Sequence, residues 1–268
     1  MQENVNKILE THQTSDGILR LLLNDPKSKN TLSDQMILRL KEEIFNASND
    51  NSIKVIVIAA VGDVFCSGHN LRELIDARSN EDDGRAYFLD LFNLCSSLMQ
   101  MIISCSKPVI AEINGVATAA GCQLVASCDL AIASDSSKFA TPGVNIGLFC
   151  STPMVALSRN ISKKDSMKML LTGDMINAEE AKRISLINDH VSADKLNDSV
   201  ISLAKKIASK PLSTVKIGKD AFYRQYEMSL TEAYEFTSKV MTENTLSDDA
   251  IEGIASFLEK RNPVWRDD

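Results

Sequence analysis

Four short, mainly apolar runs, interrupted only by Arg20 and Glu112, occur in the first half of the chain. They span Ile18–Leu23, Val55–Ala60, Val109–Ile113 and Leu130–Ala133. A strand that is half exposed shows alternating polar and apolar residues, whereas a strand covered on both faces is continuously apolar. These runs therefore predict buried strands of a sheet that has helices on both sides.

Helical patterns lie between the predicted strands. Ser33 is placed to cap a helix whose apolar side chains recur every three or four residues, at Met36, Ile37, Leu40, Ile44 and Ala47. A second stripe has the same spacing and comprises Phe88, Leu91, Phe92, Cys95, Leu98, Met99 and Ile102. Strands that alternate with helices favour parallel pairing and right-handed crossovers, so the fold class is α/β.

The strand signals stop near residue 160, and the rest of the chain reads as helical. Asn177–Glu180 has the form of a capping box that opens a short helix. Further helices are expected over roughly 194–208, 213–225, 230–245 and 248–260, the last capped by Ser247. The sequence thus predicts an α/β core over residues 1–193 and a helical C-terminal section over 194–268.

Composition limits the function classes without selecting one. The 268 residues carry 29 basic and 36 acidic side chains, a net charge of -7, which argues against a broad nucleic-acid surface. No apolar run approaches the ~20 residues that cross a membrane, and Met1–Lys7 lacks the features of a signal peptide. We therefore expect a cytoplasmic protein that binds neither nucleic acid nor a membrane.

The cysteines and histidines show no metal-binding pattern. The six cysteines have no CxxC spacing, and the three histidines are scattered along the chain. Reduced, buried thiols are the expected state of the cysteines, and no metal site is expected.

Three segments, taken in order, carry a family resemblance. They are Phe65–Asn70, Lys107–Asp129 and Phe139–Gly147. Together they closely resemble the crotonase (enoyl-CoA hydratase/isomerase) family, and the similarity extends from about Ile18 to Arg261. The resemblance implies a crotonase-like spiral of ββα units, with the C-terminal helices used to build a homotrimer or a homohexamer. It also implies an acyl-CoA thioester as substrate, with coenzyme A entering as part of that substrate and no permanently bound cofactor.

The resemblance implies an oxyanion hole made by backbone N–H groups. An acyl-CoA that becomes enolate-like places negative charge on its carbonyl oxygen, and two preorganised donors stabilise that charge. By similarity the donors belong to Cys66 and Ala120, the second at the start of a helix that includes Gly121. Packing is the alternative role of the Cys66 side chain, and a nucleophilic thiol there lacks an identifiable base.

Further positions resemble those that hold coenzyme A in the family. They are Lys27 and Lys29 after the first strand, the turn Ser67, Gly68, His69, Asn70 and Leu71, and Phe257 and Lys260 near the C-terminus, which would reach a neighbouring subunit's ligand. Solvated surface charge is the alternative for each lysine. A hydrogen-bonded loop position is the alternative for His69.

The proton-transfer positions are the chain's departure from the family pattern. Hydratases of the family carry glutamates where this chain has Gln123 and Gly143. An amide neither gains nor loses a proton at neutral pH, and glycine has no side chain. Cys150, Ser151 and Thr152 are candidates to line the reactive end of the cleft, with loop packing or helix capping as the alternative role of the two hydroxyls.

Two functions of different classes follow. The first is an acyl-CoA enzyme that uses a backbone oxyanion hole but for which efficient ordinary hydration is not expected. The second is a non-catalytic acyl-CoA-binding or assembly protein. The order of the motifs limits the substrate class better than it limits the reaction.

Overall fold

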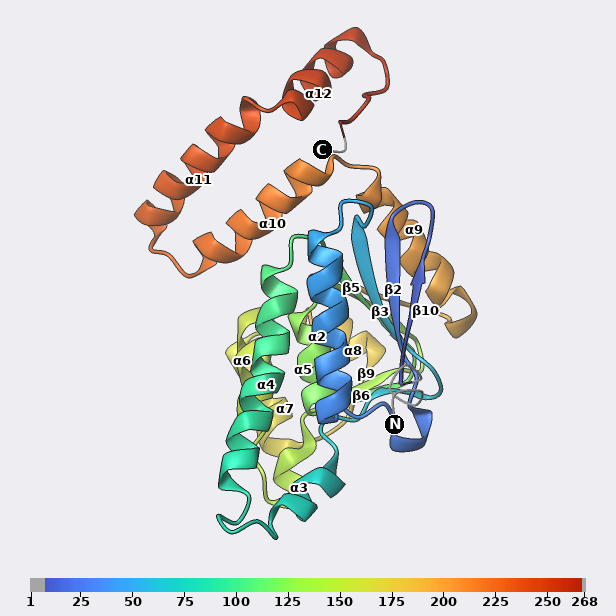
Figure 1. The fold of residues 1–268 in the computed structure, drawn as a ribbon, viewed down its shortest axis with the longest axis vertical. Helices are drawn as coiled ribbons and strands as arrows, with labels where there is room; N and C mark the ends of the chain where they lie inside the picture. The colour runs from blue at the N-terminus through green and yellow to red at the C-terminus, as the bar shows by residue number, and fades with distance from the viewer. Residues whose placement is uncertain (1–7, 267–268) are drawn as a thin grey trace.

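Two sheets and a series of helices form a spiral in the computed structural model, which describes residues 8–266. Three successive units repeat the order strand, strand, helix: β3, β4 and α3; β5, β6 and α5; β7, β8 and α6. The first strand of each unit joins one sheet and the second strand joins the other. The expected α/β spiral of ββα units is confirmed (Figure 1).

The larger sheet has the order β1-β2-β3-β5-β7-β10 and the smaller has the order β4-β6-β8-β9. Pairing is parallel except for β1 with β2 and β8 with β9, which are antiparallel. The strands are β1 (Leu9–Gln13), β2 (Ile18–Leu23), β3 (Val55–Ala60), β4 (Val64–Cys66), β5 (Val109–Ile113), β6 (Val116–Thr118), β7 (Leu130–Ser134), β8 (Lys138–Ala140), β9 (Ile176–Asn177) and β10 (Asp189–Val191).

Helices cover both faces of the larger sheet. The α-helices are α2 (Asp34–Asn49), α3 (Leu71–Ala77), α4 (Arg85–Ser104), α5 (Ala120–Ser127), α6 (Ser151–Asn160), α7 (Lys163–Thr172), α8 (Ala178–Arg183), α9 (Leu196–Ala208), α10 (Leu212–Tyr226), α11 (Leu230–Thr245) and α12 (Asp248–Glu259). Short 3-10 helices are η1 (Pro26–Ser28), η2 (Pro142–Ile146) and η3 (Ala193–Lys195).

Alternate residues of β3 face different helices, as the pleat of a strand requires. Ile56 and Ile58 pack in the main core with α2, α4 and α5, whereas Val55 and Val57 pack against α9. Both sets of side chains are fully buried. The continuous apolar run therefore has the cause that its sequence suggested: each face of the strand is covered by a different helix layer.

The predicted caps and the first predicted stripe are confirmed. Ser33, Asn177 and Ser247 each accept a hydrogen bond from the backbone N–H three residues later, and each is the N-cap of its helix. The five apolar positions of α2 are all buried. The stripe on α4 is only partly confirmed, because Phe88 is half-buried and Phe92 is 37% exposed.

Short strands account for most of what the sequence patterns missed. The strand signals were expected to end near residue 160, but β9 and β10 follow that position. They have two and three residues, and β10 begins with the polar pair Asp189-His190, so no apolar run marks them. The three-residue strands β4, β6 and β8 are too short to show a period.

One helix departs from the expectation that no apolar stretch approaches membrane-spanning length. Among residues 8–266, α4 has 20 residues and a window of mean hydropathy 1.4, which is enough by length and composition alone. Its buried side chains, including Leu91, Leu98 and Ile102, belong to the main core. The core helix of a protein outside a membrane satisfies the same criterion, so α4 does not by itself indicate a membrane span.

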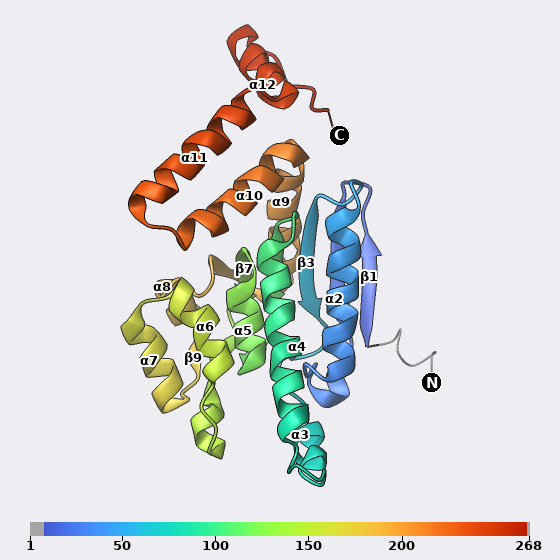
Figure 2. The same cartoon turned by 60° about the vertical axis from the view of Figure 1, so that its left-hand side comes forward.

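Helices α10, α11 and α12 extend from the core as an arm, whereas α9 lies against the sheet (Figures 1 and 2). The expected C-terminal section therefore has one helix that completes the core and three that lie beyond it. Many large apolar side chains of the arm are exposed, among them Tyr234, Leu246 and Phe257.

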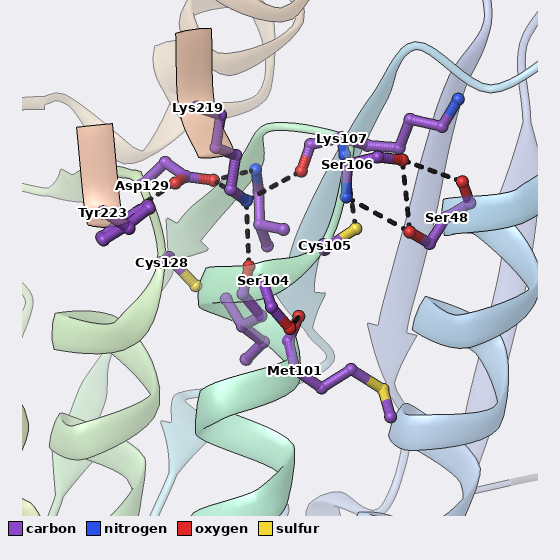
Figure 3. Close-up of polar contacts among 12 residues, drawn as sticks. Ser48, Met101, Ser104, Cys105, Ser106, Lys107, Cys128, Asp129, Lys219 and Tyr223 are labelled. Carbon is purple, nitrogen blue, oxygen red and sulfur yellow. Dashed lines mark hydrogen bonds and ion pairs between the residues drawn. The ribbon is translucent and has the colours of Figure 1, made fainter. Parts of the chain in front are cut away.

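A buried lysine fixes α10 to the core (Figure 3). Lys219 Nζ donates to the carbonyl oxygens of Ile102 and Lys107, both at 2.9 Å, and lies 2.7 Å from Asp129 Oδ2. Tyr223 OH and the Val109 N–H donate to the same carboxylate at 2.9 and 2.7 Å. One carboxylate thus joins the segment after α5, the start of β5 and the arm, which gives Asp129 a structural role.

We expect Lys219→Met to lower the free energy of unfolding by about 3–5 kcal/mol, because it leaves the Asp129 carboxylate without its cation in a site that is largely shielded from water. The matched control is Lys205→Met. Lys205 pairs with Asp16, and both of these side chains are about half exposed, so the change should stay within about 0.5 kcal/mol. Urea unfolding measures both. Equal effects would contradict the structural role given to Lys219.

Candidate functional site

A cavity of about 460 Å³ opens where the turn after β4, the start of α5 and the segment η2–α6 meet α3 and α4. Its walls are formed by Ser67, His69, Leu71, Leu74, Phe92, Ala119, Ala120, Pro142, Gly143, Asn145, Ile146, Leu148, Phe149, Cys150, Ser151, Thr152 and Pro153. Ser67, Ala119 and Pro142 follow the ends of β4, β6 and β8, three strands of the smaller sheet. The spiral therefore brings these three residues to one cavity.

No charged side chain lines the cavity among residues 8–266. The wall is mostly aliphatic, aromatic or backbone, and its titratable side chains are those of His69 and Cys150. A pocket of this kind, apolar with a few convergent polar groups, is typical of a small-molecule site. Its chemistry depends on which polar groups point inward without a partner.

The turn after β4 supplies one such group. Cys66 ends β4, is fully buried and lies outside the cavity wall. The Ser67 N–H donates to Lys29 O at 3.2 Å, and the Gly68 N–H donates to the Cys66 sulfur. The N–H of His69 has no hydrogen-bond partner in residues 8–266, and His69 lies on the wall. His69 is therefore the residue of this turn with a free backbone donor at the cavity.

The start of α5 supplies the second. Ala120 is the first residue of α5, so its N–H has no acceptor within the helix, and none exists elsewhere in the described chain. Ala119 precedes it at φ 52°, a left-handed conformation that turns the chain sharply from β6 into the helix. Both residues lie on the cavity wall. The helix N-terminus adds a partial positive charge at the same point.

Two glycines allow the turn and the helix to approach this closely. A Cβ atom at Gly121 would lie 2.1 Å from the carbonyl oxygen of Cys66, far inside contact distance. Gly68 has φ 93°, and a Cβ atom there would lie 2.9 Å from the Ala119 Cβ and 3.3 Å from the Ala120 nitrogen. The free N–H groups of His69 and Ala120 thus come from segments in direct contact.

The His69 side chain is held in one tautomer by its surroundings. Its Nδ1 lies 3.3 Å from the carbonyl oxygen of Leu32, which only accepts, so Nδ1 carries the proton. Burial lowers the pKa of the imidazole, so the ring is neutral at pH 7. The ring packs edge-on against Phe92, with centroids 5.5 Å apart, and Nε2 has no hydrogen-bond partner among residues 8–266.

The Cys150 side chain lies in the space that a side chain at position 143 would need. A Cβ atom at Gly143 would lie 2.7 Å from the carbonyl oxygen of Leu148 and 2.9 Å from Cys150 Sγ. The Leu148 N–H donates to Gly143 O at 2.9 Å, which closes this loop. Burial raises the pKa of the Cys150 thiol, and the Gly143 N–H that donates to it acts in the opposite direction. Position 143 therefore has no room for a side chain unless the loop is rebuilt.

Gln123 is buried one turn into α5 and lies outside the cavity wall. It is 3% exposed, and its Oε1 has no hydrogen-bond partner in the structure. The backbone of Gln123 is tied into the helix, since its N–H donates to Ala119 O at 3.0 Å.

The structure brings together about half of the residues proposed from the sequence. Those on the cavity wall are Ala120, Gly143, Ser67, His69, Leu71, Cys150 and Ser151. Those outside it are Cys66, Gln123, Lys27, Lys29, Gly68, Asn70, Gly121, Phe257 and Lys260. Asn70 instead caps α3, where its side chain accepts from the Arg72 N–H at 3.1 Å.

The loop that carries Lys27 and Lys29 adjoins the turn although it lies outside the cavity wall. Leu32 N donates to Gly68 O at 2.8 Å, and Asn30 Nδ2 donates to the carbonyl oxygens of Val61 and Val64. The loop and the turn are therefore one hydrogen-bonded unit, and the carbonyl oxygen of Lys29 accepts from Ser67, which lies on the cavity wall.

Phe257 and Lys260 lie at the far end of the molecule from the cavity. They belong to the end of α12, which lies at the opposite end of the view from α3 in both Figures 1 and 2. Phe257 is 82% exposed. Neither residue contacts the cavity of its own chain.

Ser151 and Thr152 do not cap α6, contrary to the alternative considered for them. Cys150 is the N-cap residue of α6, and Ser151 and Thr152 are its first two helical residues, both on the cavity wall. Glu112 lies away from the cavity and pairs with Arg20 at 2.5 Å across the sheet.

Several wall residues were not identified from the sequence. They include Leu74, Phe92, Asn145, Ile146, Leu148, Phe149 and Pro153. Phe92 belonged to the helical stripe assigned to the core, and no local signal distinguishes a cavity wall from a core position.

The six cysteines are free and buried, and in residues 8–266 no group of three His, Cys, Asp or Glu side chains is arranged to hold a metal ion. Burial raises the pKa of Cys66 and that of Cys122 to about 12, so these thiols stay protonated at neutral pH. Neither lies on the cavity wall.

Comparison with known proteins identifies the family to which the chain is similar. The sequence model described as enoyl-CoA hydratase/isomerase matches residues 13–268. A Xenopus laevis protein named enoyl-CoA hydratase domain-containing protein 3, mitochondrial, is 48% identical over 253 residues, which is 94% of this chain and 84% of the relative.

Solved structures agree over nearly the whole chain. The crystal structure of human enoyl coenzyme A hydratase domain-containing protein 3 has a TM-score of 0.92 and 47% identity, covering 96% of this chain and 100% of that one. An enoyl-CoA hydratase structure from Mycobacterium smegmatis has a TM-score of 0.93 and 42% identity, covering 97% and 99%.

The cytoplasmic location expected from the sequence is wrong. The relative at 48% identity is named a mitochondrial protein, which contradicts that expectation. Residues Met1–Lys7, on which the expectation partly rested, lie outside the described residues.

We expect Gly121→Ala to lower the free energy of unfolding by about 1–3 kcal/mol or more, because the new methyl group collides with a backbone carbonyl that cannot move alone. Gly218→Ala in α10 is the matched control. No atom lies within 4 Å of a Cβ atom there, so better helix propensity should stabilise the protein by up to ~1 kcal/mol. Urea unfolding measures both variants. Changes in the free energy of unfolding of opposite sign for the two variants support the close contact at Gly121, and a stabilised Gly121→Ala variant refutes it.

Proposed function

The chain belongs to the enoyl-CoA hydratase/isomerase family, and from that premise we propose that it binds acyl-CoA thioesters in the uncharged cavity. The thioester carbonyl oxygen would lie between the backbone N–H groups of His69 and Ala120. Both donors lie at the cavity wall without an acceptor in the part of the chain that the structure describes, and Ala120 lies at a helix N-terminus. This pair of free donors is the observation that carries the proposal.

This proposal replaces one of the two donors named from the sequence. Cys66 is buried in β4 outside the wall, whereas His69, three residues later, has a free N–H on the wall. Ala120 keeps its role. Two N–H groups without a protein acceptor at one cavity are placed to donate to a ligand that supplies an oxygen atom.

The bound thioester would be activated by charge stabilisation. When a proton leaves the α-carbon or a nucleophile adds, negative charge develops on the carbonyl oxygen, where fixed donors stabilise it by a few kcal/mol each. The donors belong to rigid backbone, so they need no reorganisation during the reaction. Fold and donors alone do not select among the reactions that pass through such an oxyanion.

Proton transfer is the step of hydration for which the cavity wall offers the fewest suitable groups. Hydration requires groups that move protons to and from water and the α-carbon. No carboxylate lines the cavity in the described residues, and its titratable side chains are a neutral His69 and a protonated Cys150. We therefore propose a family member whose ordinary hydratase activity is low.

A non-catalytic acyl-CoA-binding protein is the second candidate. The absence of a carboxylate on the wall favours it, while the free donors favour a site that still acts on the thioester carbonyl. Incubation with saturated, enoyl, hydroxyacyl and malonyl-type thioesters, followed by mass spectrometry, separates the two. Any enzyme-dependent product supports the first candidate, and binding without a product supports the second.

We propose a mitochondrial location and a trimer or hexamer. The location follows from the name of the relative at 48% identity. The assembly rests on the exposed apolar side chains of the arm and on the remoteness of Phe257 and Lys260 from their own cavity. In an assembly these two residues would reach the ligand of a neighbouring subunit, and the arm formed by α10, α11 and α12 would supply the contacts.

We expect hydration of a short enoyl-CoA about 10²–10⁴-fold slower than by an efficient family member, because carboxylate acid–base assistance is missing from the wall. Loss of enoyl absorbance, with a purified efficient hydratase as the positive control, measures the rate. Efficient hydration by pure protein would show that the reasoning about the wall is wrong, and His69→Gln and Cys150→Ser would then identify the group responsible.

Restoring the two glutamates is not expected to raise that rate. A side chain at position 143 collides with Leu148 O, so Gly143→Glu rebuilds the loop instead of adding a base. A gain of tenfold or more in Gln123→Glu/Gly143→Glu would show that the loop adapts.

We expect the triple variant Lys27→Ala/Lys29→Ala/Lys260→Ala to bind coenzyme A more weakly, with a larger loss at low salt than at high salt, because salt screens exposed charges. Calorimetry measures affinity, and light scattering reports the assembly that Lys260 requires. Lys168→Ala is the control, since Lys168 lies on α7 outside the cavity. A monomer, or an equal loss at both salt concentrations, would contradict the placement of these lysines.

A further inference from the structure

We propose that the chain after α12 is a clasp that holds this helix with its apolar face turned outward, and that assembly of the subunits depends on the closed clasp. The clasp comprises residues 261–266, the last part of the chain that the structure describes. The inference rests on the assembly part of the proposed function, because α12 carries Phe257 and leads into Lys260, the two residues proposed to reach a neighbouring ligand.

Helix α12 is amphipathic in the opposite sense from a helix that covers a core. Its buried residues are the polar Asp249 and Ser256, whereas its large apolar side chains Ile251, Ile254 and Leu258 are each more than half exposed. A helix turns by about 100° per residue, so the buried pair and the apolar set lie on opposite faces. The polar face meets the protein and the apolar face meets solvent, the reverse of the usual arrangement.

Apolar packing within the arm does not fix this orientation. Helix α11, all of which the structure describes, buries no side chain, and the side chains that α12 buries are not apolar. A helix of 12 residues is marginal in water by itself and depends on tertiary contacts for its stability. The polar contacts of α12 therefore decide whether the helix stays in place with its apolar face outward.

Asp249 ties α12 to the start of α10 and to the clasp. Its Oδ2 accepts from Ser213 Oγ at 2.6 Å, and its Oδ1 accepts from the backbone N–H of Arg266 at 3.1 Å. The Arg266 guanidinium pairs with the neighbouring Asp248. Both oxygens of a buried carboxylate thus have a donor, one from α10 and one from the clasp.

Glu252 binds the clasp one turn further along the same face of α12. The two terminal nitrogens of Arg261 donate to its two oxygens at 2.5 and 2.8 Å, and the Val264 N–H donates to it at 2.9 Å. These bonds, that of Arg261 foremost, lower the pKa of Glu252 to about 2, so the carboxylate is ionised at neutral pH. A two-pronged pair of this kind fixes the orientation of the groups as well as their distance.

Trp265 closes the clasp where the arm begins. Its indole N–H donates to the carbonyl oxygen of Ser209, the C-cap residue of α9, at 3.0 Å. Its ring lies against Gly253 on the polar face of α12, where a Cβ atom would be 3.4 Å from the ring. Trp265 is half-buried, whereas the rest of the clasp is exposed. The end of the chain thus returns to the start of the arm (Figure 1), which closes α10, α11 and α12 into a ring.

Two variants that open the clasp test the inference by light scattering over a dilution series. Deletion of residues 261–268 removes the clasp, and Gly253→Leu keeps it but needs the space of the Trp265 ring. Gly253→Ala is the matched control, since a methyl group there reaches only ordinary contact distance. We expect both clasp variants to raise the dissociation constant of the assembly by about tenfold or more, equivalent to ~1.4 kcal/mol, and the control to leave it within about twofold.

Hydrogen exchange, measured where the wild-type protein is also dissociated, separates the clasp from the stability of the core. In both clasp variants the amides of α12 should exchange about tenfold faster or more, because a detached helix of this length is not stable, while the amides of α9 and of the larger sheet keep their rates. Unchanged exchange in α12 overturns the inference. Faster exchange that extends to α9 and the sheet also overturns it, because the tail would then stabilise the whole protein instead of orienting one helix.

The proposed assembly and the clasp fail in different ways. If the wild-type protein is a monomer at every concentration, the proposed assembly fails and the control of assembly by the clasp fails with it. If the wild type assembles and both clasp variants assemble equally well, the assembly stands and the inference is overturned. If only the deletion weakens assembly, the deleted residues act by direct contact with a neighbour, and the inference is overturned as well.

Discussion

The contact between the turn after β4 and the first residues of α5 determines the geometry of the site. Gly121 lies against the carbonyl oxygen of Cys66 so closely that a methyl group would not fit, and Gly68 is similarly confined beside Ala119. This approach brings the free N–H groups of His69 and Ala120 to the same cavity. Because the donors are backbone groups, the site depends on glycine packing and helix placement more than on any reactive side chain.

The rest of the fold holds α5 in this position. Its first residue is set by β6 and the turn at Ala119, and the Asp129 carboxylate beyond its last turn is bound by Lys219 and Tyr223 from α10. The helix is therefore fixed at both ends, once by the sheet and once by the arm. The walls around the donors are mostly apolar, with Cys150 Sγ beside the space that a side chain at Gly143 would need.

The sequence predicted the strands and helices that show a clear pattern of apolar residues, and it missed those that show no such pattern. The buried run Val55–Ala60 and the capped helix of Ser33 follow from local pattern, whereas β9 has only two residues and shows none. In the site, Ala120 lies on the wall at the start of α5, the helix start that a sequence motif marks. For the turn the sequence pointed to the N–H of Cys66, whereas we propose that of His69, because Cys66 lies in β4 outside the wall and the Ser67 N–H is bound by the carbonyl oxygen of Lys29, which is distant in the sequence. Phe92 and Leu148 reach the cavity only through tertiary packing.

The central claim is that two backbone donors polarise a bound thioester carbonyl. Infrared difference spectroscopy of a bound saturated acyl-CoA, with and without ¹³C at the thioester carbonyl, measures that polarisation directly. Two hydrogen bonds from His69 and Ala120 weaken the carbonyl bond, so its stretching frequency should fall on binding relative to the thioester in water. A bound ligand whose carbonyl frequency is unchanged or higher would contradict the account.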